Sequence, residues 1–262
     1  MKINRILAIV QQELFITSRA YEVLADIFVF PVMSMVVFGF LSLYLTGSTN
    51  PQIAHSILLG IVMWQIIAIV QYSLPVGALW NIWWRNLSNL FITPLTTAEY
   101  ITALTISGVC KSVIVFFLGS VMSYYVFNYN IFEIGILNIL LFSLNLIFFG
   151  FAFGLIILGV IFKYGSRVQA FAWGLLPFLQ PLTAVFYPVT VLPAPLQYFS
   201  YLFPPTHVFE AMRASLTTPG VYWNFIGIAF LENVLFIFFG IIFFNAMFKA
   251  SKESGQFARN EG

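Results

Sequence analysis

Long apolar runs separated by short polar stretches dominate the chain. A helix needs about 20 predominantly apolar residues to cross the hydrocarbon core of a bilayer. The segments that approach this length are residues 27–46, 57–79, 104–127, 134–161, 168–187 and 224–248. The pattern predicts an all-α integral membrane protein in which residues 1–262 form a single transmembrane domain with six transmembrane helices.

The fifth of these segments, residues 168–187, differs from the others in its prolines. It carries no charged residue but contains Pro177 and Pro181. Proline lacks an amide donor and clashes with the preceding helical turn. We therefore expect a kinked or broken span at this point.

Residues 1–24 precede the first span and form a separate element. Apolar side chains recur there at helical spacing, whereas Arg5, Gln12 and Arg19 fall elsewhere on the helical wheel. The recurring apolar residues are Ile3, Leu7, Val10 and Leu14. This pattern predicts an N-terminal interfacial helix with its apolar face in lipid. Packing against the protein's own spans is the alternative, and both place the helix at the cytoplasmic surface.

The Lys and Arg residues are distributed unevenly between the two sides of the predicted bundle. Cytoplasmic loops carry an excess of these residues, and an even number of spans places both termini on one side. With the termini inside, Lys111 lies within a span and only Arg213 is external. The cytoplasmic set is Lys2, Arg5, Arg19, Arg85, Lys163, Arg167, Lys249, Lys252 and Arg259. The bias predicts a multi-pass inner (plasma) membrane protein with cytoplasmic N- and C-termini.

The composition agrees with a lipid bilayer as the main solvent. Hydrophobic residues make up 61% of the chain and charged residues 8%, whereas soluble domains carry about 25% charged residues. The net charge of +2 does not suggest a nucleic-acid partner. With one cysteine and two histidines, the chain has too few donors for a metal site.

Motifs for catalysis or energy supply are missing from the sequence. There is no GxxxxGK[ST] phosphate loop, no HExxH motif and no Ser/His/Asp set. We therefore expect a protein that is not an enzyme and that holds no cofactor of its own. Any work that it does takes its energy from a partner or from an ion gradient.

Residues 80–103 form a long cytoplasmic connection between two spans. LSNLFI, at residues 87–92, is predicted to form a short amphipathic helix. Thr96 or Thr97 is expected to cap the next helix, with Glu99 in its first turn. The segment is either an ordinary loop with tryptophan anchors at the interface or a docking element through which a soluble partner transmits a push.

Residues 188–223 form a long external connection whose first part is apolar and rich in prolines and aromatic residues. A solvated loop would be polar, and irregular backbone at membrane depth must be buried in protein or line a cavity. The segment is predicted to form external re-entrant helices that cap a cavity before the last span, one of them beginning at Pro205. Glu210 and Arg213 are expected to pair at i,i+3 spacing, either within this cap or as a surface ion pair worth little.

Two charged residues, Lys111 and Glu232, fall inside predicted spans. Such groups are costly and usually face a partner or a water-filled cavity. Their different depths argue against a direct pair. Lys111 is expected to extend to the cytoplasmic interface. Glu232 makes either a buried structural hydrogen bond or the ion-coupling group of a secondary transporter, although the chain shows no internal repeat of the kind common in such carriers.

Together these features resemble the membrane subunits of type-2 ABC exporters. The resemblance covers nearly the whole chain. It is carried by Arg85 through Glu99, with a "TPL" turn at residues 93–95, and by FYPVTVLPAPLQYFSYLFPPTHVFEAMR at residues 186–213. Many relatives have a more charged coupling segment than WWRNLSNLF.

The resemblance implies a cytoplasmic coupling helix, an external gate and a set of partners. The coupling residues are Trp84, Arg85, Asn86, Leu90, Thr93, Pro94 and Leu95. The gate residues are Pro188, Leu192, Pro193, Pro204, Pro205, His207, Glu210 and Arg213. The implied assembly is a homodimer, or a heterodimer with a sister permease, bound to two copies of a cytoplasmic ABC ATPase that binds ATP and Mg. The implied substrate is amphiphilic or hydrophobic: a drug-like molecule, a lipid or a lipid-linked glycan.

Overall fold

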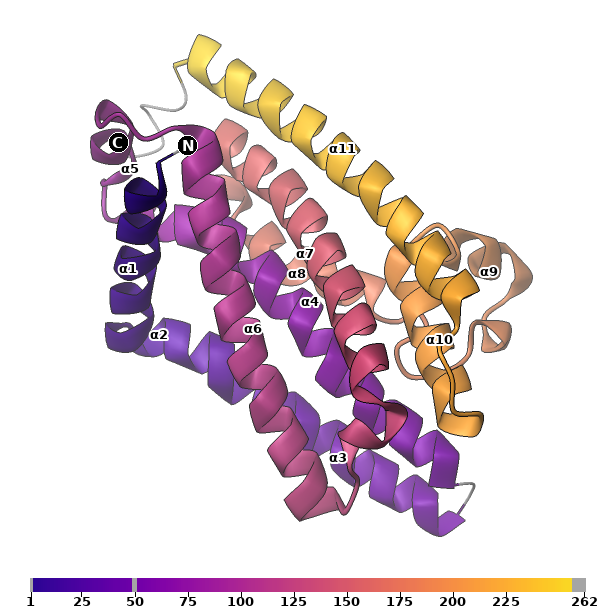
Figure 1. Ribbon diagram of the computed structural model, residues 1–262. Helices are drawn as coiled ribbons and strands as arrows, with labels where there is room; N and C mark the ends of the chain where they lie inside the picture. Colours follow the sequence, from indigo (N-terminus) through magenta and orange to yellow (C-terminus); the bar gives the residue numbers. More distant parts are fainter. Residues whose placement is uncertain (1, 49–50, 256–262) are drawn as a thin grey trace.

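The computed structural model describes residues 2–48 and 51–255, and all regular secondary structure in these ranges is helical (Figure 1). Within these residues, five helices are long and apolar enough to cross a membrane. The prediction of an all-α chain with several helices long and apolar enough to span a membrane is therefore confirmed for the described residues. Its sixth full-length helix is not present among the described residues.

Each of the five long helices covers all or nearly all of one expected span and extends beyond it at one end or both. The first is continuous through α2 (Tyr21–Leu24), a π-helical turn η1 (Ala25–Val29) and α3 (Phe30–Ser48). The others are α4 (Pro51–Trp83), α6 (Thr97–Phe127), α7 (Ile136–Tyr164) and α11 (Trp223–Glu253). Arg259, which entered the charge analysis, lies outside the described residues.

The expected span at residues 168–187 is broken, as its prolines predict. It forms only α8 (Ala170–Leu179), and the residues that follow form turns up to Tyr187. At about 1.5 Å per residue, ten residues reach about 15 Å, half of the hydrocarbon thickness. Pro177 lies within α8 and Pro181 lies two residues after its end. The segment therefore does not form a continuous spanning helix, in agreement with the expected break.

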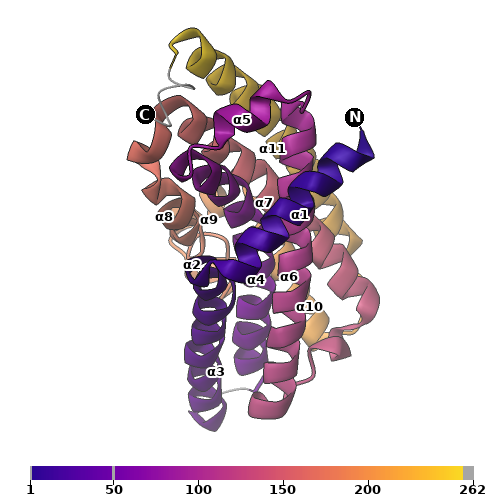
Figure 2. The same ribbon diagram turned by 90° about the vertical axis from the view of Figure 1, so that its left-hand side faces the viewer.

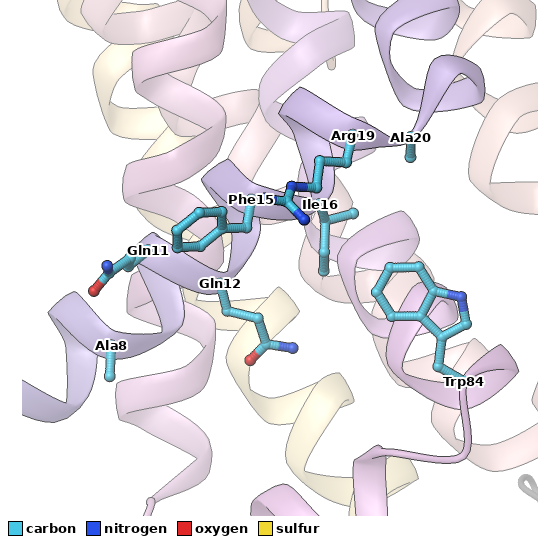
Figure 3. A pocket seen from close by; sticks show the side chains of 8 residues that line it. All are labelled: Ala8, Gln11, Gln12, Phe15, Ile16, Arg19, Ala20 and Trp84. Carbon is cyan, nitrogen blue, oxygen red and sulfur yellow. The ribbon is translucent and has the colours of Figure 1, made fainter.

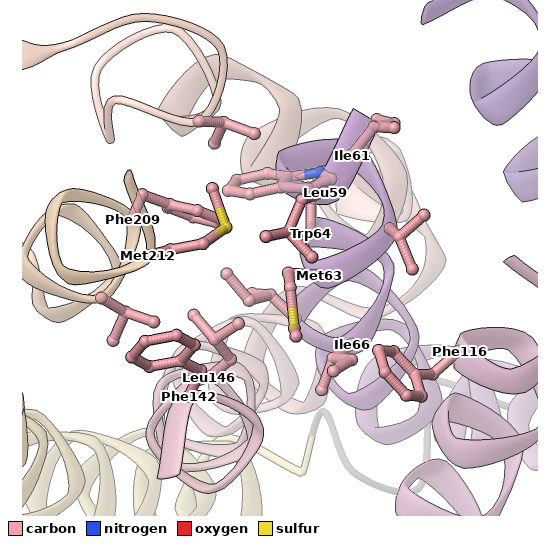
Figure 4. Close-up of a cluster of buried hydrophobic side chains, with 14 of the residues drawn as sticks. Leu59, Ile61, Met63, Trp64, Ile66, Phe116, Phe142, Leu146, Phe209 and Met212 are labelled. Carbon is pink, nitrogen blue, oxygen red and sulfur yellow. The ribbon is translucent and has the colours of Figure 1, made fainter. Parts of the chain in front are cut away.

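Helix α4 lies at the centre of the bundle, with 83% of its most apolar window buried. Its side chains interlock with those of α6, α7 and α10 (Pro204–Thr217) around Met63, Phe142 and Phe209 (Figure 4). A second apolar cluster joins α4, α6, α7 and α11 to α1 (Ile3–Arg19) and α5 (Leu87–Ile92). The core is thus continuous along α4, while α3 and α11 expose most of their surface.

The two ends of the bundle are built from different elements. Figures 1 and 2 show α1, α5 and the C-terminal end of α11 at one end, and the C-terminal end of α6 at the other. Helix α7 finishes near the first end, whereas α11 begins at the opposite side, beside α10 (Figure 1). The chain between α7 and α11 therefore traverses the bundle even though α8 is short.

Candidate functional site

Helix α1 both packs against the spans of the protein and leaves an apolar face uncovered, so it combines the two alternatives that its sequence allowed. One face, with Ile9, Glu13 and Ile16, is buried against the bundle, where α1 contacts α6. The face predicted to meet lipid is largely exposed, since Ile3 and other members of the apolar set remain uncovered. Helix α1 thus packs on the protein and presents an apolar surface outward at the same time.

A groove of about 610 Å³ lies between α1 and the C-terminal end of α4. Phe15 and Arg19 line it from α1, and Trp84 lines it from the opposite side (Figure 3). Trp84 is a predicted coupling residue, and its side chain is exposed. The groove and the coupling segment therefore form one continuous surface at this end of the bundle.

Helix α5 coincides with the predicted LSNLFI helix. The chain turns sharply out of α4 at Arg85, whose φ of 53° lies in the left-handed region. Leu87, the first residue of α5, is fully buried. Asn81 joins the surrounding elements: its carboxamide oxygen accepts from Gln12 at 2.9 Å and from Asn86 at 3.1 Å. These contacts tie α5 to both α1 and α4.

Glu99 joins the start of α6 to α1. Its carboxylate accepts the backbone N–H groups of Thr96 at 2.9 Å and of Lys2 at 2.7 Å, and it lies 3.6 Å from the Arg5 guanidinium. Thr96 accepts in return from the Glu99 N–H at 3.2 Å, which completes the predicted cap as a capping box. Arg5 also donates to the Pro94 carbonyl. The segment after α5 is therefore fastened to the N-terminal helix.

The predicted coupling residues divide into an exposed group and a supporting group. Those exposed are Trp84, Arg85, Thr93 and Pro94, and those half-buried are Asn86, Leu90 and Leu95. The prediction missed Ile92, which is 82% exposed and is the last residue of α5. The sequence feature that could have indicated Ile92 is its position at the apolar end of LSNLFI.

Residues 188–223 form the expected short helices: η4 (Val189–Val191), α9 (Ala194–Ser200) and α10. The prolines occupy the positions where they cost least, because the first residues of a helix need no amide donor. Pro188 and Pro193 directly precede η4 and α9, and α10 begins with Pro204 and Pro205, one residue earlier than predicted. Leu192, between η4 and α9, is half-buried.

Glu210 and Arg213 pair as predicted, and the pair holds several elements together. The Arg213 Nη2 atom lies 2.9 Å from Glu210 Oε1, which also accepts from the Val189 N–H at 2.8 Å. Arg213 Nη1 donates to the Ala184 carbonyl at 2.6 Å, in the turn after α8. Both side chains are at least four-fifths buried, so the alternative of a surface ion pair does not describe them.

Lys111 and Glu232 pair with different partners, in agreement with their expected separation. Lys111 does not extend to the interface: its amine is buried 3.5 Å from Glu13 on α1. Sequence reasoning missed Glu13, whose signal was its spacing from the buried Ile9 and Ile16. Glu232 lies 3.2 Å from His207 Nε2 on α10. Burial opposes protonation of His207, but the hydrogen bond and charge of Glu232 outweigh it and raise the pKa of the imidazole.

A cavity of about 360 Å³ opens between α3, α4 and α8. Asp26 lies at its edge and accepts hydrogen bonds from the Tyr72 hydroxyl at 2.7 Å and from the Trp173 indole at 3.2 Å. Sequence reasoning missed Asp26 because the predicted first span began one residue later. The sequence feature that could have indicated Asp26 is its position as a carboxylate at the edge of an apolar run.

No curated protein matches this chain. The family model described as ABC-2 type transporter matches residues 4–217. This range runs from α1 through α5 to the end of α10 and includes both segments on which the resemblance rests. The chain therefore belongs to the ABC-2 type transporter membrane proteins, as a non-catalytic transmembrane subunit.

Proposed function

We propose that the chain is the membrane-spanning permease subunit of an ATP-driven exporter that moves an amphiphilic or hydrophobic substrate out of the cytoplasm. Membership of the family implies a partner ABC ATPase. The proposed assembly contains two permease copies and two ATPase copies, and the ATPases bind ATP and Mg. A homodimer is the simplest form of the permease pair.

The observation that carries this proposal is the fastening of α5 and the TPL turn to α1. Glu99, Arg5 and Asn81 connect three elements that are separate in sequence. A force applied to the exposed side of α5 is therefore shared with α1, α4 and α6. This is the property that a coupling helix needs, because a loosely attached helix would absorb the push of its partner.

The proposed topology has six crossings and cytoplasmic termini. The helix ends that carry the predicted cytoplasmic Lys and Arg residues, those of α1, α4, α7 and α11, lie on the same side of the bundle as α5 (Figures 1 and 2). Since α7 ends there and α11 begins opposite, α8 and the turns after it supply the broken fifth crossing. The excess of positive charge supports a cytoplasmic location for this side.

The external helices are proposed to form the outer gate. The Glu210–Arg213 pair binds α10 to η4 and to the turn after α8. The same turn lies directly on α4: a Cβ atom at Gly60 would be only 2.4 Å from the Val185 carbonyl oxygen. The gate helices and the broken crossing therefore move together or not at all.

Labelling from outside the cell tests the topology. Cys110 is exposed and is first replaced by alanine. Single cysteines then replace Tyr198 on α9, which is 79% exposed, and Asn89 on α5, which is also exposed. An impermeant maleimide is expected to label position 198 in intact cells and position 89 only after lysis. Labelling of both positions from the same side would contradict the proposal.

Photo-crosslinking tests the partner. A crosslinking amino acid at Ile92 is expected to capture an ABC ATPase in intact cells, whereas the same group at Tyr198 is expected to capture none. In proteoliposomes, export with the captured ATPase should require ATP hydrolysis. Export that persists without the ATPase and stops when the proton gradient is dissipated would instead favour an ion-coupled transporter that uses the His207–Glu232 pair.

A further inference from the structure

Asp26 differs from the other shielded acids of this protein in having no basic partner. Among residues 2–48 and 51–255, the other acids that are not exposed lie within 4 Å of a lysine, arginine or histidine nitrogen. These acids are Glu13, Glu99, Glu210 and Glu232. Asp26 is half-buried and forms no ion pair with a described residue. A half-buried carboxylate is costly unless its charge is compensated, and no described residue supplies the cation for Asp26.

The two hydrogen bonds to Asp26 orient the carboxylate without neutralising it. Tyr72 and Trp173 both donate to the same oxygen, Oδ2. Neutral donors stabilise a carboxylate but leave its charge in place. The second oxygen, Oδ1, is therefore available to a ligand that enters the cavity.

The walls of the cavity suit a cation that carries apolar groups. Aromatic rings line it from every side: Phe30 and Phe38 from α3, Trp64 and Tyr72 from α4, and Trp173 from α8. Ring faces attract cations, and they do so most strongly where water is excluded. A hydrated metal ion would gain little from contact with these aromatic rings, whereas an organic cation can contact both the rings and the carboxylate.

The backbone at Asp26 is irregular in a way that serves a site. Residues Ala25–Val29 form a π-helical turn within an otherwise α-helical segment. Such turns occur frequently at functional sites, because the extra residue redirects side chains around the helix. Here the turn carries Asp26 at the edge of the cavity, opposite Tyr72 and Trp173.

We infer that the cavity between α3, α4 and α8 binds an organic cation, with its charge on Asp26 and its apolar groups against Trp64, Tyr72 and Trp173. This inference deepens the proposed function, on which its role in transport rests, by assigning a charge to the exported amphiphile. The positive group belongs either to a soluble lipophilic cation or to the amine headgroup of a lipid. Both have the same recognition chemistry.

Two ions of the same shape and opposite charge test this inference. The full-length protein in neutral detergent is dialysed against tetraphenylphosphonium or tetraphenylborate, and the bound fraction gives the dissociation constant. Tetraphenylphosphonium is expected to bind. Asp26→Asn is expected to weaken its binding by about 10- to 100-fold, because the attraction between the phosphonium charge and the carboxylate is lost. Tetraphenylborate should gain nothing from Asp26.

Glu22→Gln is the matched control, because Glu22 is a nearby exposed acid that does not line the cavity. It should leave the affinity for tetraphenylphosphonium within about twofold. Trp173→Leu should weaken tetraphenylphosphonium binding by about 2- to 30-fold through loss of a ring. If Asp26→Asn fails to fold, the affinity of Trp173→Leu tests the inference in its place. Equal affinity of the wild type and Asp26→Asn, or an equal loss in Glu22→Gln, overturns the inference.

Lipid composition separates the two sources of the cation. In nanodiscs of phosphatidylglycerol, added phosphatidylethanolamine should weaken tetraphenylphosphonium binding competitively if a lipid amine occupies the cavity, and should not change it if the ligand is a soluble amphiphile. Binding is measured on the permease alone. Failure to find an ATPase would therefore refute the proposed function and leave this result standing, and the reverse also holds.

Discussion

Replacing Lys111 by methionine tests whether the buried contact between α1 and α6 is an ion pair. The Lys111 amine lies 3.5 Å from the Glu13 carboxylate, and both side chains are less than one-tenth exposed. Exposed pairs contribute about 0–1 kcal/mol, whereas removal of one partner from a buried pair costs about 3–5 kcal/mol. Because Glu13 Oε1 has no hydrogen-bond partner, the pair is imperfect, and we expect a loss of about 3 kcal/mol, at the lower end of this range.

The loss should depend on pH. Burial raises the pKa of Glu13, and Lys111 opposes this effect. Without Lys111, Glu13 in the folded protein binds a proton more readily than in the unfolded chain. The stability of Lys111→Met should therefore fall as pH rises above the ordinary glutamate pKa of about 4.3. We expect the variant to be closer to the wild type at pH 5 than at pH 8.

Thermal unfolding of the purified protein in detergent, followed by circular dichroism, measures the effect in a double-mutant cycle with Glu13→Gln. The double variant should be more stable than the sum of the single losses predicts. Lys249→Met is the matched control, because Lys249 lies 3.7 Å from Glu253 with both side chains more than two-thirds exposed. If Lys111→Met costs no more than Lys249→Met, or if the single losses add, the buried ion pair is refuted.

Three further predictions concern the ties within the two end segments. Asn81→Leu leaves the Tyr100 hydroxyl without its amide partner; it should cost about 1–3 kcal/mol in thermal unfolding and reduce crosslinking at α5, whereas unchanged crosslinking would contradict the role of Asn81. Glu210→Gln should weaken the link between α10 and η4 by about 1–3 kcal/mol, seen as faster proteolysis of the external segment at unchanged expression. Glu232 raises the pKa of His207 above its usual 6.5. The contribution of the protonated His207–Glu232 pair to the stability of the fold is therefore complete below pH 6.5 and is lost as pH rises through the raised pKa. His207→Gln should flatten that part of a melting-temperature profile, and an unchanged profile would exclude His207.

Local patterns were sufficient for the elements whose shape depends on their own residues. Five of the six predicted apolar runs form long helices among the described residues, LSNLFI coincides with α5, and Thr96 and Glu99 form the expected cap. Residues 168–187 show the limit. Pro177 and Pro181 predicted a break, but not that α8 would stop at ten residues, because the length after a break depends on neighbours such as α4 that satisfy the freed backbone groups.

The polar contacts between elements were harder to predict because a scan for apolar runs treats each charge only as an interruption. A shielded carboxylate is costly unless its charge is compensated, so it requires a cation nearby. Glu13 pairs with Lys111 on α6, Glu99 with Arg5 on α1 and Glu232 with His207 on α10. Glu210 pairs with Arg213 on its own helix. Three of these acids thus identify a packing contact through a cation on a second element, and Glu210 identifies one through its hydrogen bond from the Val189 N–H on η4. Asp26 pairs with no cation among the described residues, and the compensation that the other four acids find within the protein is here assigned to a ligand.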